Sequence, residues 1–395
     1  MRNIYSHKQA NPATHVFIAI PCLLLGGTEM QTLNLARVLV AGGYKVTVCC
    51  YYENDARMVY SFRESGTEVI LMGLERSQGL FYLIIKLLAL FKKNNPDIVH
   101  VQYMAPGFAP ILAARLSGVR TVFATVHQPG RTHGIKAKVL LRTGAMLCTA
   151  FFCVSKATEE SWFGKSAVFE LKNGKRAKKR KHYTIYNSID ASSVIKRVMK
   201  TNRAALRTSL GLDRCLVVGA VGRLREEKGQ DLLIRAMAIV VQSVPEACLL
   251  IVGDGPDREK LQKLSEDLNL HKHIHWAGQL DPEAVIPYYA IMDVAVVPSR
   301  FEGFGLAAVE AMATGLPVLA SNVDGLCEVV KNEETGYLVP LENRALLADR
   351  IVALLTNLDK AAVMGRAGRK RVEQYFSMEN FSNVILAVYK YYRNS

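Results

Sequence analysis

The feature that most constrains the fold of this chain is a regular alternation of short apolar runs with helical patterns, repeated in two series. In the first half the apolar runs lie at residues 15–21, 45–51, 97–102, 120–126, 150–154 and 183–186, with helical stretches such as 28–41 and 107–117 between them. In the second half they lie at 216–221, 248–252, 273–277, 294–297 and 317–320. Strands that alternate with helices predict parallel sheets covered by helices on both faces.

Two such series in 395 residues predict an α/β protein with two Rossmann-like domains that face a central cleft. The boundary is expected after a polar, basic segment at 172–182, which has no apolar period and is predicted to be an exposed loop. We therefore assign residues 1–187 to an N-terminal Rossmann-like domain and 188–376 to a C-terminal Rossmann-like domain. Residues 377–395 are predicted to form an amphipathic helix with Ser377 as its cap and an apolar face made of Phe381, Val384, Ile385, Val388 and Tyr392.

The net charge of +15 is concentrated in one half of the chain. Residues 1–190 carry 25 Lys/Arg and 11 Asp/Glu, whereas residues 191–395 carry 25 and 24. The first half is therefore expected to meet an anionic partner: nucleic acid, a lipid surface or a phosphorylated substrate. Solubility alone is the alternative explanation. The candidate contacts to membrane or acceptor are the cations of the most basic segment: Lys175, Arg176, Lys178, Lys179, Arg180 and Lys181.

The cysteines and the length of the longest apolar stretch indicate the cellular location that we expect for the protein. The eight cysteines form no Cys-x-x-Cys pair and mostly lie in apolar runs, which predicts buried free thiols in a reducing compartment. The N-terminal residues do not resemble a signal peptide. The longest apolar stretch, 79–91, is interrupted by Lys86 and is shorter than the ~20 residues of a transmembrane span, so it fits a buried helix or one in a membrane interface. We expect a cytoplasmic protein, with peripheral attachment to the inner membrane face as a further hypothesis.

Candidate chemistry lies where apolar runs of the second half lead into helices, most strongly in the segment 299–313. Gly303 and Gly305 flank Phe304, so the backbone there can approach a ligand closely, and the free amides at the helix start suit an anion. Glu302 and Glu310 can face the same ligand at different depths. A carboxylate in such a place can accept hydrogen bonds from the vicinal hydroxyls of a ribose or a pyranose.

Two further junctions accompany it. Arg223 and Lys228 bracket a short loop that leads into a helix, and together they can neutralise a diphosphate. The Gly-Lys-Ser/Thr order of a Walker loop is absent. The segment 253–256 lacks the third glycine of a dinucleotide fingerprint, so by itself it indicates only a tight turn.

As an ordered set, these motifs resemble the retaining, nucleotide-sugar-dependent glycosyltransferases of family four. That resemblance implies the GT-B fold, in which two Rossmann-like domains face a cleft and a C-terminal helix crosses back to the first domain. It also implies that residues 1–187 form the acceptor-side domain and residues 188–376 the nucleotide-sugar-binding domain. The chain departs from the family pattern at Ser188, where glycine is usual, and at Leu326-Cys327, where Ile-Pro is usual. The resemblance spans nearly the whole chain and rests on the segments 26–29, 187–190, 222–229, 253–256, 302–310 and 335–340.

The resemblance also implies a role for each candidate residue. Arg223 and Lys228 would hold the donor diphosphate and stabilise the departing nucleotide. Glu302 would bind sugar hydroxyls, and Glu310 would bind ribose hydroxyls. His127 matches the family's cleft histidine near the donor sugar, so the implied catalytic set is His127, Glu302, Arg223 and Lys228. The other donor contacts would come from Gly26, Gly27, Gly253, Phe304, Gly305 and Leu306. His100, inside an apolar run, is expected to be structural.

The implied reaction moves a hexose or N-acetylhexosamine from a nucleoside-diphosphate sugar to a glycan or lipid-linked acceptor, with retention, in the synthesis of a cell-surface polysaccharide. Oriented cations and amides can stabilise the leaving phosphate, so neither a metal nor a separate cofactor is expected. UDP-sugar is favoured as the donor over GDP-mannose.

Three alternatives stay open. A sugar-nucleotide epimerase with the same fold would need no acceptor. A catalytically silent, membrane-associated binding protein would not need the intact set of two cations and two glutamates. Nucleic acid is not expected as a partner, because only His182 and Tyr183 offer rings near the basic segment and no recognised module is present.

Overall fold

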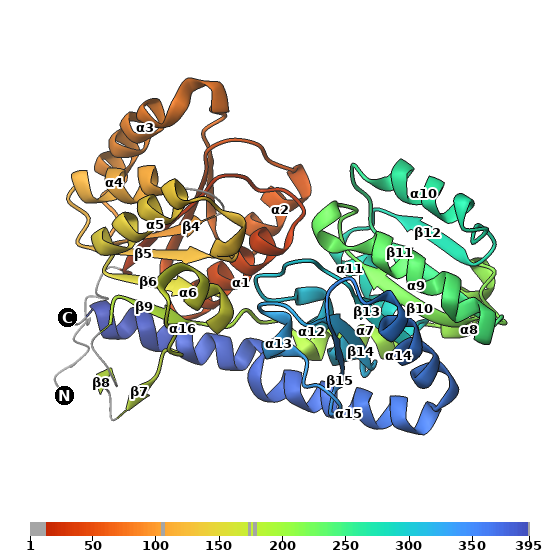
Figure 1. The fold of residues 1–395 in the computed structure, drawn as a ribbon. Coiled ribbons are helices and arrows are strands. Elements are labelled where there is room, and N and C mark those ends of the chain that lie inside the picture. The colour runs from red at the N-terminus through yellow and green to blue at the C-terminus, as the bar shows by residue number, and fades with distance from the viewer. Residues whose placement is uncertain (1–12, 104–106, 173–174, 177–179, 394–395) are drawn as a thin grey trace, which may run out of the picture.

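The computed structural model describes residues 13–103, 107–172, 175–176 and 180–393. Two parallel sheets form the centres of two α/β units (Figure 1). The N-terminal sheet has seven strands in the order β3-β2-β1-β4-β5-β6-β9. Its strands are β1 (His15–Ile20), β2 (Lys45–Cys50), β3 (Glu68–Leu71), β4 (Ile98–Tyr103), β5 (Thr121–Val126), β6 (Ala150–Cys153) and β9 (His182–Thr184). All six runs predicted in this half are strands.

Helices cover both faces of the N-terminal sheet. One face packs against α3 (Gly79–Asn94), α4 (Phe108–Leu116) and α5 (Ile135–Leu147), which contribute buried residues such as Leu87, Ile111 and Leu141. The other face packs against α1 (Gly27–Ala41), α2 (Ala56–Glu64) and the C-terminal α16 (Met378–Arg393). The helix α6 (Lys156–Phe163) follows β6. These amphipathic helices bury their apolar stripes on a sheet that is apolar on both faces, as parallel sheets require.

The C-terminal sheet has six strands in the order β12-β11-β10-β13-β14-β15. In both sheets the strand order reverses beside the first strand of the unit, at β1/β4 and at β10/β13, and ligands of such sheets bind at the carboxyl ends of the strands near this point. The strands are β10 (Leu216–Val221), β11 (Ala247–Val252), β12 (Ile274–Gly278), β13 (Val294–Val297), β14 (Val318–Ser321) and β15 (Gly336–Val339). The helices are α7 (Ala191–Lys200), α8 (Arg203–Ser209), α9 (Gln230–Ser243), α10 (Arg258–Asp267), α11 (Pro282–Ala290), α12 (Leu306–Thr314), α13 (Leu326–Val329), α14 (Arg344–Thr356) and α15 (Leu358–Tyr375).

The two units are joined by two crossing segments. Near residue 188 the chain passes into the second unit, and it returns at Ser377, where α16 begins and crosses to the first (Figure 1). The crossings are bonded to each other, because Ile189 N donates to Phe376 O at 3.0 Å and Met378 N donates to Ile189 O at 3.1 Å. Ser377 Oγ accepts a hydrogen bond from Asn380 N at 3.4 Å, which confirms the predicted cap.

Ser188, the residue that replaces the usual glycine, is tied to the first unit. Its amide donates to Gln31 Oε1 at 3.0 Å, and its carbonyl accepts from Gln31 Nε2 at 2.8 Å and Asn34 Nδ2 at 3.2 Å. Both side chains lie on α1. The linker is therefore anchored at its exit from the first unit, which makes the two crossings the pivot for any relative motion of the units.

Four features differ from the sequence-based expectations. The short strands β3 and β15 were not predicted: the residues of β3 are exposed or half-buried, and β15 begins with a glycine, which weakens a strand pattern. The segment expected to be a loop contains a two-stranded antiparallel ribbon, β7 (Leu171–Lys172) with β8 (Lys175–Arg176). The expectation of eight free thiols is wrong for one pair: Cys215 and Cys248 form a disulfide with their Cα atoms 5.7 Å apart, since the neighbouring strands β10 and β11 bring them together. Cys22, Cys49, Cys50, Cys148 and Cys153 are free and buried, as predicted, and the sixth free thiol, Cys327, is partly buried.

Candidate active site

The cleft is lined by loops that leave the carboxyl ends of strands in both units. From the N-terminal unit come the start of α1, with Gly26 and Gly27, and His127 after β5. From the C-terminal unit comes the segment 299–305 between β13 and α12. These loops touch across the cleft: a Cβ placed on Gly27 would lie 3.0 Å from Leu306 Cδ1, and one placed on Gly303 would lie 2.0 Å from His127 O. Position 303 therefore accepts only glycine in this closed arrangement.

Lys228 and Glu302 are paired with each other. Lys228 Nζ donates to Glu302 Oε2 at 2.6 Å, and Ser299 Oγ lies 3.4 Å from the same oxygen. The ammonium stands at the end of the short 3-10 turn Glu226–Lys228, and the carboxylate precedes α12. Both side chains keep some exposure, 32% for Lys228 and 18% for Glu302. The predicted phosphate-binding cation and the predicted sugar-binding carboxylate thus lie at one point of the cleft.

Arg223 offers an exposed guanidinium in the same loop. No ion pair or side-chain hydrogen bond links it to any residue that the structure describes. Its charge opposes the rise in the pKa of Glu29 that burial causes, so Arg223 lies near the start of α1 across the cleft. Gly253 packs closely against the backbone of this loop, because a Cβ placed on it would lie 2.0 Å from Gly222 O. Arg223 is therefore held next to the cleft with its charge available to a ligand.

Glu310 lies deeper, on α12, and is half-buried. Its Oε2 accepts a hydrogen bond from the hydroxyl of buried Tyr289, on α11, at 2.9 Å. Burial raises the pKa of this carboxyl to about 7, and the hydrogen bond from Tyr289 opposes the rise. A hydroxyl-rich ligand that donates hydrogen bonds to Glu310 would favour its ionised form.

The backbone at the start of α12 is shaped to receive a ligand. Gly305, at its N-cap, has φ of 101°, a conformation that side chains rarely adopt. The amides of Leu306 and Ala307 precede the first helical hydrogen bond, from Ala308 N to Gly305 O at 3.0 Å, and can bind an anion. Phe304 is buried and packs on Phe376 with ring centroids 5.3 Å apart. It anchors the loop and leaves ligand contact to its backbone.

The two histidines have different surroundings. His127 Nε2 lies 2.9 Å from Oε1 of buried Gln102, and burial lowers the pKa of His127 to about 4, so the ring is neutral near pH 7. His100 is buried between Tyr389 Oη and Thr125 Oγ1, each at 2.7 Å, and links β4 to α16. His100 is therefore structural, as expected, whereas His127 borders the cleft.

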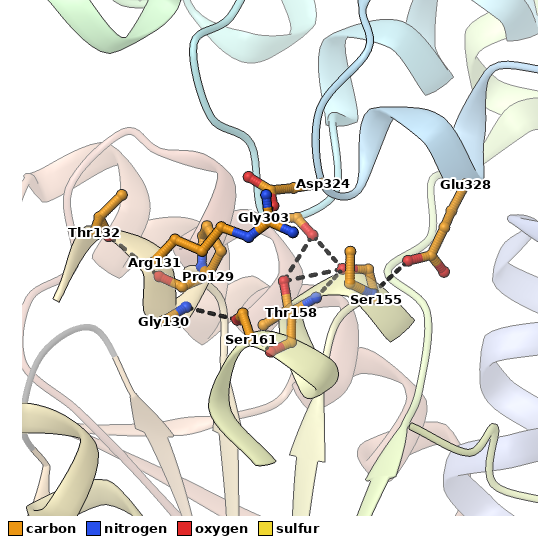
Figure 2. A network of polar contacts seen from close by, with 11 residues as sticks. Pro129, Gly130, Arg131, Thr132, Ser155, Thr158, Ser161, Gly303, Asp324 and Glu328 are labelled. Carbon is orange, nitrogen blue, oxygen red and sulfur yellow. Dashed lines mark hydrogen bonds and ion pairs between the residues drawn. The ribbon is translucent and has the colours of Figure 1, made fainter. Parts of the chain in front are cut away.

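A polar network that the sequence analysis missed joins the segment 299–305, between β13 and α12, to the N-terminal unit (Figure 2). Ser155 Oγ and Thr158 Oγ1, at the start of α6, donate to Gly303 O at 2.6 and 3.0 Å. Glu328 accepts from the amides of Lys156 at 3.0 Å and Ala157 at 2.7 Å, so it caps α6 from the opposite unit. The spacing of Ser155 and Thr158 indicates a helix cap, but nothing local names the carbonyl that they bind.

Two more contacts fix the same region. Arg131 Nε lies 3.6 Å from the buried Asp324 Oδ1, again across the cleft. Arg300 pairs with both oxygens of Asp231 at 2.8 Å and also contacts Glu342, and these carboxylates raise the pKa of Arg300. Because Arg300 N also donates to Glu227 O at 2.8 Å, this residue fastens the loop of Glu302 to the loop of Lys228.

Two cations of the basic segment 175–181 are bonded to backbone carbonyls of the protein. Arg180 Nη1 donates to Ser166 O at 3.1 Å, and Lys181 Nζ donates to Met146 O and Cys148 O at 3.2 Å. Lys175 and Arg176 lie in β8. Lys178 and Lys179 lie outside the described residues. The contact of this set to membrane or acceptor stays a prediction.

Two Rossmann-like units whose glycine-rich strand ends face one cleft, with a C-terminal helix that returns to the first unit, have the GT-B architecture. Family models match both units: residues 25–168 match Glycosyltransferase Family 4, and residues 203–371 match Glycosyl transferases group 1. The chain belongs to the family-four glycosyltransferases.

Individual relatives place the chain within this family. GDP-mannose-dependent alpha-(1-6)-phosphatidylinositol monomannoside mannosyltransferase of Mycobacterium tuberculosis is 36% identical over 177 residues, which are 43% of this chain and 46% of that protein. The match thus spans less than half the length of this relative. N-acetyl-alpha-D-glucosaminyl L-malate synthase of Bacillus anthracis is 27% identical over 309 residues, 78% of each chain.

Solved structures show the same fold. Anabaena Alr3699/HepE in complex with UDP has a TM-score of 0.78 at 19% identity, covering 95% of this chain and 100% of that one. Sucrose-phosphate synthase from Thermosynechococcus elongatus has a TM-score of 0.75 at 23% identity, covering 96% and 98%. The predicted architecture of two Rossmann-like domains and a returning C-terminal helix is confirmed.

Proposed function

We propose that the protein transfers a hexose or N-acetylhexosamine from a nucleoside-diphosphate sugar to a glycan or lipid-linked acceptor, with retention. The observation that carries this proposal is the gathering of Arg223, Lys228, Glu302 and Glu310 around the start of α12, opposite Gly27 and His127. Support comes from the relatives, whose names give GDP-mannose and glycosyl acceptors, and from Alr3699/HepE, which was solved with UDP.

The arrangement suits the charges of the reaction. Breaking the bond between an anomeric carbon and a diphosphate leaves negative charge on the phosphate, which Arg223, Lys228 and the amides at Leu306 would stabilise. Glu302, held by Lys228 in the free state, would turn to the sugar hydroxyls once the phosphate engages the ammonium. The neutral ring of His127 can exchange a hydrogen bond with a sugar hydroxyl without adding charge.

Closure of the cleft would keep water from the reacting sugar. The bonds from Ser155 and Thr158 to Gly303 O form only when the units are together, so they couple closure to the shape of the loop 299–305. These two hydroxyls are positioning groups, because they act through the loop backbone.

The double variant Ser155→Ala, Thr158→Val should lower kcat about tenfold and leave the affinity for free nucleoside diphosphate within threefold. The reason is that Gly303 O loses both donors in the closed state, at a cost of about 1–3 kcal/mol. Steady-state kinetics with nucleotide titration measures both quantities. Ser166→Ala, an exposed hydroxyl bonded to Glu160 within the same unit, is the matched control. An unchanged kcat would show that the network is not coupled to the reaction.

Nucleotide identity is open to a direct test. We expect UDP to raise the melting temperature more than GDP or ADP, by mass action on the folded state. Thermal-shift titration of the three diphosphates measures the order, and a larger shift with GDP would favour GDP-mannose, the second candidate donor. The absence of any shift with all three would contradict the proposed donor class.

Transfer should proceed in excess chelator and give a product with the donor's anomeric configuration. Protein cations and amides are expected to stabilise the leaving phosphate, so removing divalent metal should change the rate less than twofold. NMR of the product formed with and without EDTA measures both the rate of transfer and the anomeric configuration. Activity that requires added manganese or magnesium, or an inverted product, would be inconsistent with them. A new sugar isomer formed from donor alone would identify an epimerase instead.

A further inference from the structure

The outer surface of the α3–α4–α5 layer has an unusual composition for a protein surface in water. On α3, Leu80, Phe81 and Ile85 are exposed by 54%, 76% and 47%. On α5, Ile135, Val139 and Leu140 are exposed by 81%, 57% and 38%. We call these six residues the α3–α5 surface. Both helices already bury a separate stripe against the sheet, through Leu87 and Leu141 for example, so the exposed residues are additional to the core.

These residues lie near one edge of the molecule. The two helices flank α4 in one layer, with α4 in contact with each, and they cover the same face of the sheet (Figure 1). Because α3 follows β3 and α5 follows β5, both helices begin at the carboxyl edge of the parallel sheet, which is the cleft edge. The six residues of the α3–α5 surface occupy the first two turns of their helices, whereas Met146, 74% exposed, lies in the last turn of α5. His127 starts the loop that leads directly into α5.

Cations outnumber carboxylates around this surface, although exposed Glu75 lies five residues before Leu80. Residues 98–158 contain no aspartate or glutamate and seven lysines and arginines. Lys86 on α3 and Lys136 on α5 are exposed, and Lys138 is half-buried. None of the three forms an ion pair with a carboxylate in the described part of the chain. Part of the charge excess of the first half, Lys86, Lys136 and Lys138, therefore lies on the two helices that carry the exposed apolar residues.

We propose that the α3–α5 surface docks on an anionic lipid bilayer. Apolar side chains that enter the interface, flanked by unpaired cations, match a negatively charged membrane surface. A second copy of this chain would bring like charges together, and nucleic acid would leave the aliphatic residues without a partner. The docking places the cleft edge beside the bilayer, where a lipid-linked acceptor would enter. That orientation rests on the proposed function, whereas the docking itself does not.

This proposal moves the expected contact away from the segment 175–181. Lys181 Nζ is bonded to two carbonyls at the end of α5, and Arg180 to Ser166 O. β8, the part of this segment that pairs with β7, lies apart from α3 (Figure 1). Lys178 and Lys179 are therefore the rival location, and the experiment includes them.

Co-sedimentation of the full chain with vesicles tests the proposal. One set of vesicles is phosphatidylcholine alone, and the other is an equimolar mixture of phosphatidylcholine and phosphatidylglycerol. We expect binding to the mixture only, weakened by high salt. Since a basic residue near an anionic surface strengthens binding roughly fivefold, Lys136→Gln with Lys138→Gln should weaken it roughly 25-fold. Phe81→Ser with Ile135→Ser should weaken it about tenfold or more through lost apolar burial.

Matched variants separate the surface from general effects. Leu358→Ser with Val363→Ser removes two similarly exposed apolar residues from α15, and should leave binding unchanged. Lys178→Gln with Lys179→Gln removes the same charge from the rival segment, and a loss equal to that of the α5 pair would overturn the location. Equal recovery with both vesicles, or no binding, would overturn the docking. So would dimerisation through Phe81 and Ile135, seen by light scattering, without vesicle binding.

The readouts keep the two proposals distinct. Donor turnover with a soluble acceptor should be unaffected by the four substitutions on α3 and α5, because none of them lies among the cleft residues. Lost docking with normal turnover would affect this inference alone. Normal docking without any nucleotide binding would affect the proposed function alone.

Discussion

Lys228→Ala and Arg223→Ala should each lower kcat/KM by roughly 30- to 1,000-fold, about 2–4 kcal/mol of transition-state stabilisation. The physical reason is that each cation, held on a loop at the cleft, would face the developing charge on the diphosphate. Arg223 has no carboxylate partner among the described residues, whereas Lys228 is shared with Glu302 at 2.6 Å. Lys228→Ala should therefore also release Glu302, so its loss should extend to KM for the donor.

Arg225→Ala is the matched control for these variants. Arg225 is exposed in the same loop, two residues from Arg223, and makes no ion pair within the described part of the chain. It should change kcat/KM by less than threefold. Steady-state kinetics on variants with unchanged circular dichroism makes the comparison. If all three variants kept normal kinetics, the cations would not act on the phosphate and the site would be misplaced.

Glu310→Gln should stabilise the free protein at pH 8 and weaken nucleotide binding. Burial raises the pKa of Glu310 from 4.5 to about 7. At one pKa unit per 1.36 kcal/mol, holding the ionised carboxylate in the folded state costs up to about 3 kcal/mol above pH 7. Glutamine keeps an acceptor for Tyr289 and removes the charge. It also removes the strong acceptor that the nucleotide's ribose is expected to use.

The sign of the pH dependence follows from the raised pKa. Below about pH 4.5 the carboxyl is neutral in both states, so the variant and the parent should unfold alike. As pH rises toward 7, the unfolded state releases its proton first, and the parent loses stability that the variant keeps. Thermal unfolding from pH 5 to pH 8, without nucleotide, should show a widening difference. Glu259→Gln, on the exposed face of α10, should show none, and a parent more stable than Glu310→Gln at pH 8 would contradict the assignment.

Much of the fold could be predicted from local patterns. The long apolar strands β1, β2, β4 and β10 carry a continuous signal because both of their faces are buried. The short edge strand β3 does not, since its four residues are only partly covered. The disulfide between Cys215 and Cys248 was missed for a different reason: pairing depends on strand register, which cysteine spacing does not reveal.

The candidate site, like the fold, has one part that the local sequence predicts and another that depends on the tertiary structure. Its glycines, cations and glutamates have to occupy particular points of a strand-loop-helix junction, so their order along the chain is informative by itself. The contact from Ser155 to Gly303 joins residues 148 positions apart and depends on how the two units meet. Glu328 caps α6 for the same reason, although its own sequence surroundings indicate only a short helix.

The sequence by itself determined the class of fold, the two-unit organisation and the residues that gather at the cleft, because these follow from periodicity, backbone freedom and charge that neighbouring residues share. Only the tertiary structure decided that Lys228 and Glu302 are paired, that His100 supports α16 while His127 borders the cleft, and that the exposed apolar residues of α3 and α5 share one layer. Those relations join groups distant in the chain. Packing of whole elements sets them, and no local pattern of residues encodes where two such elements will meet.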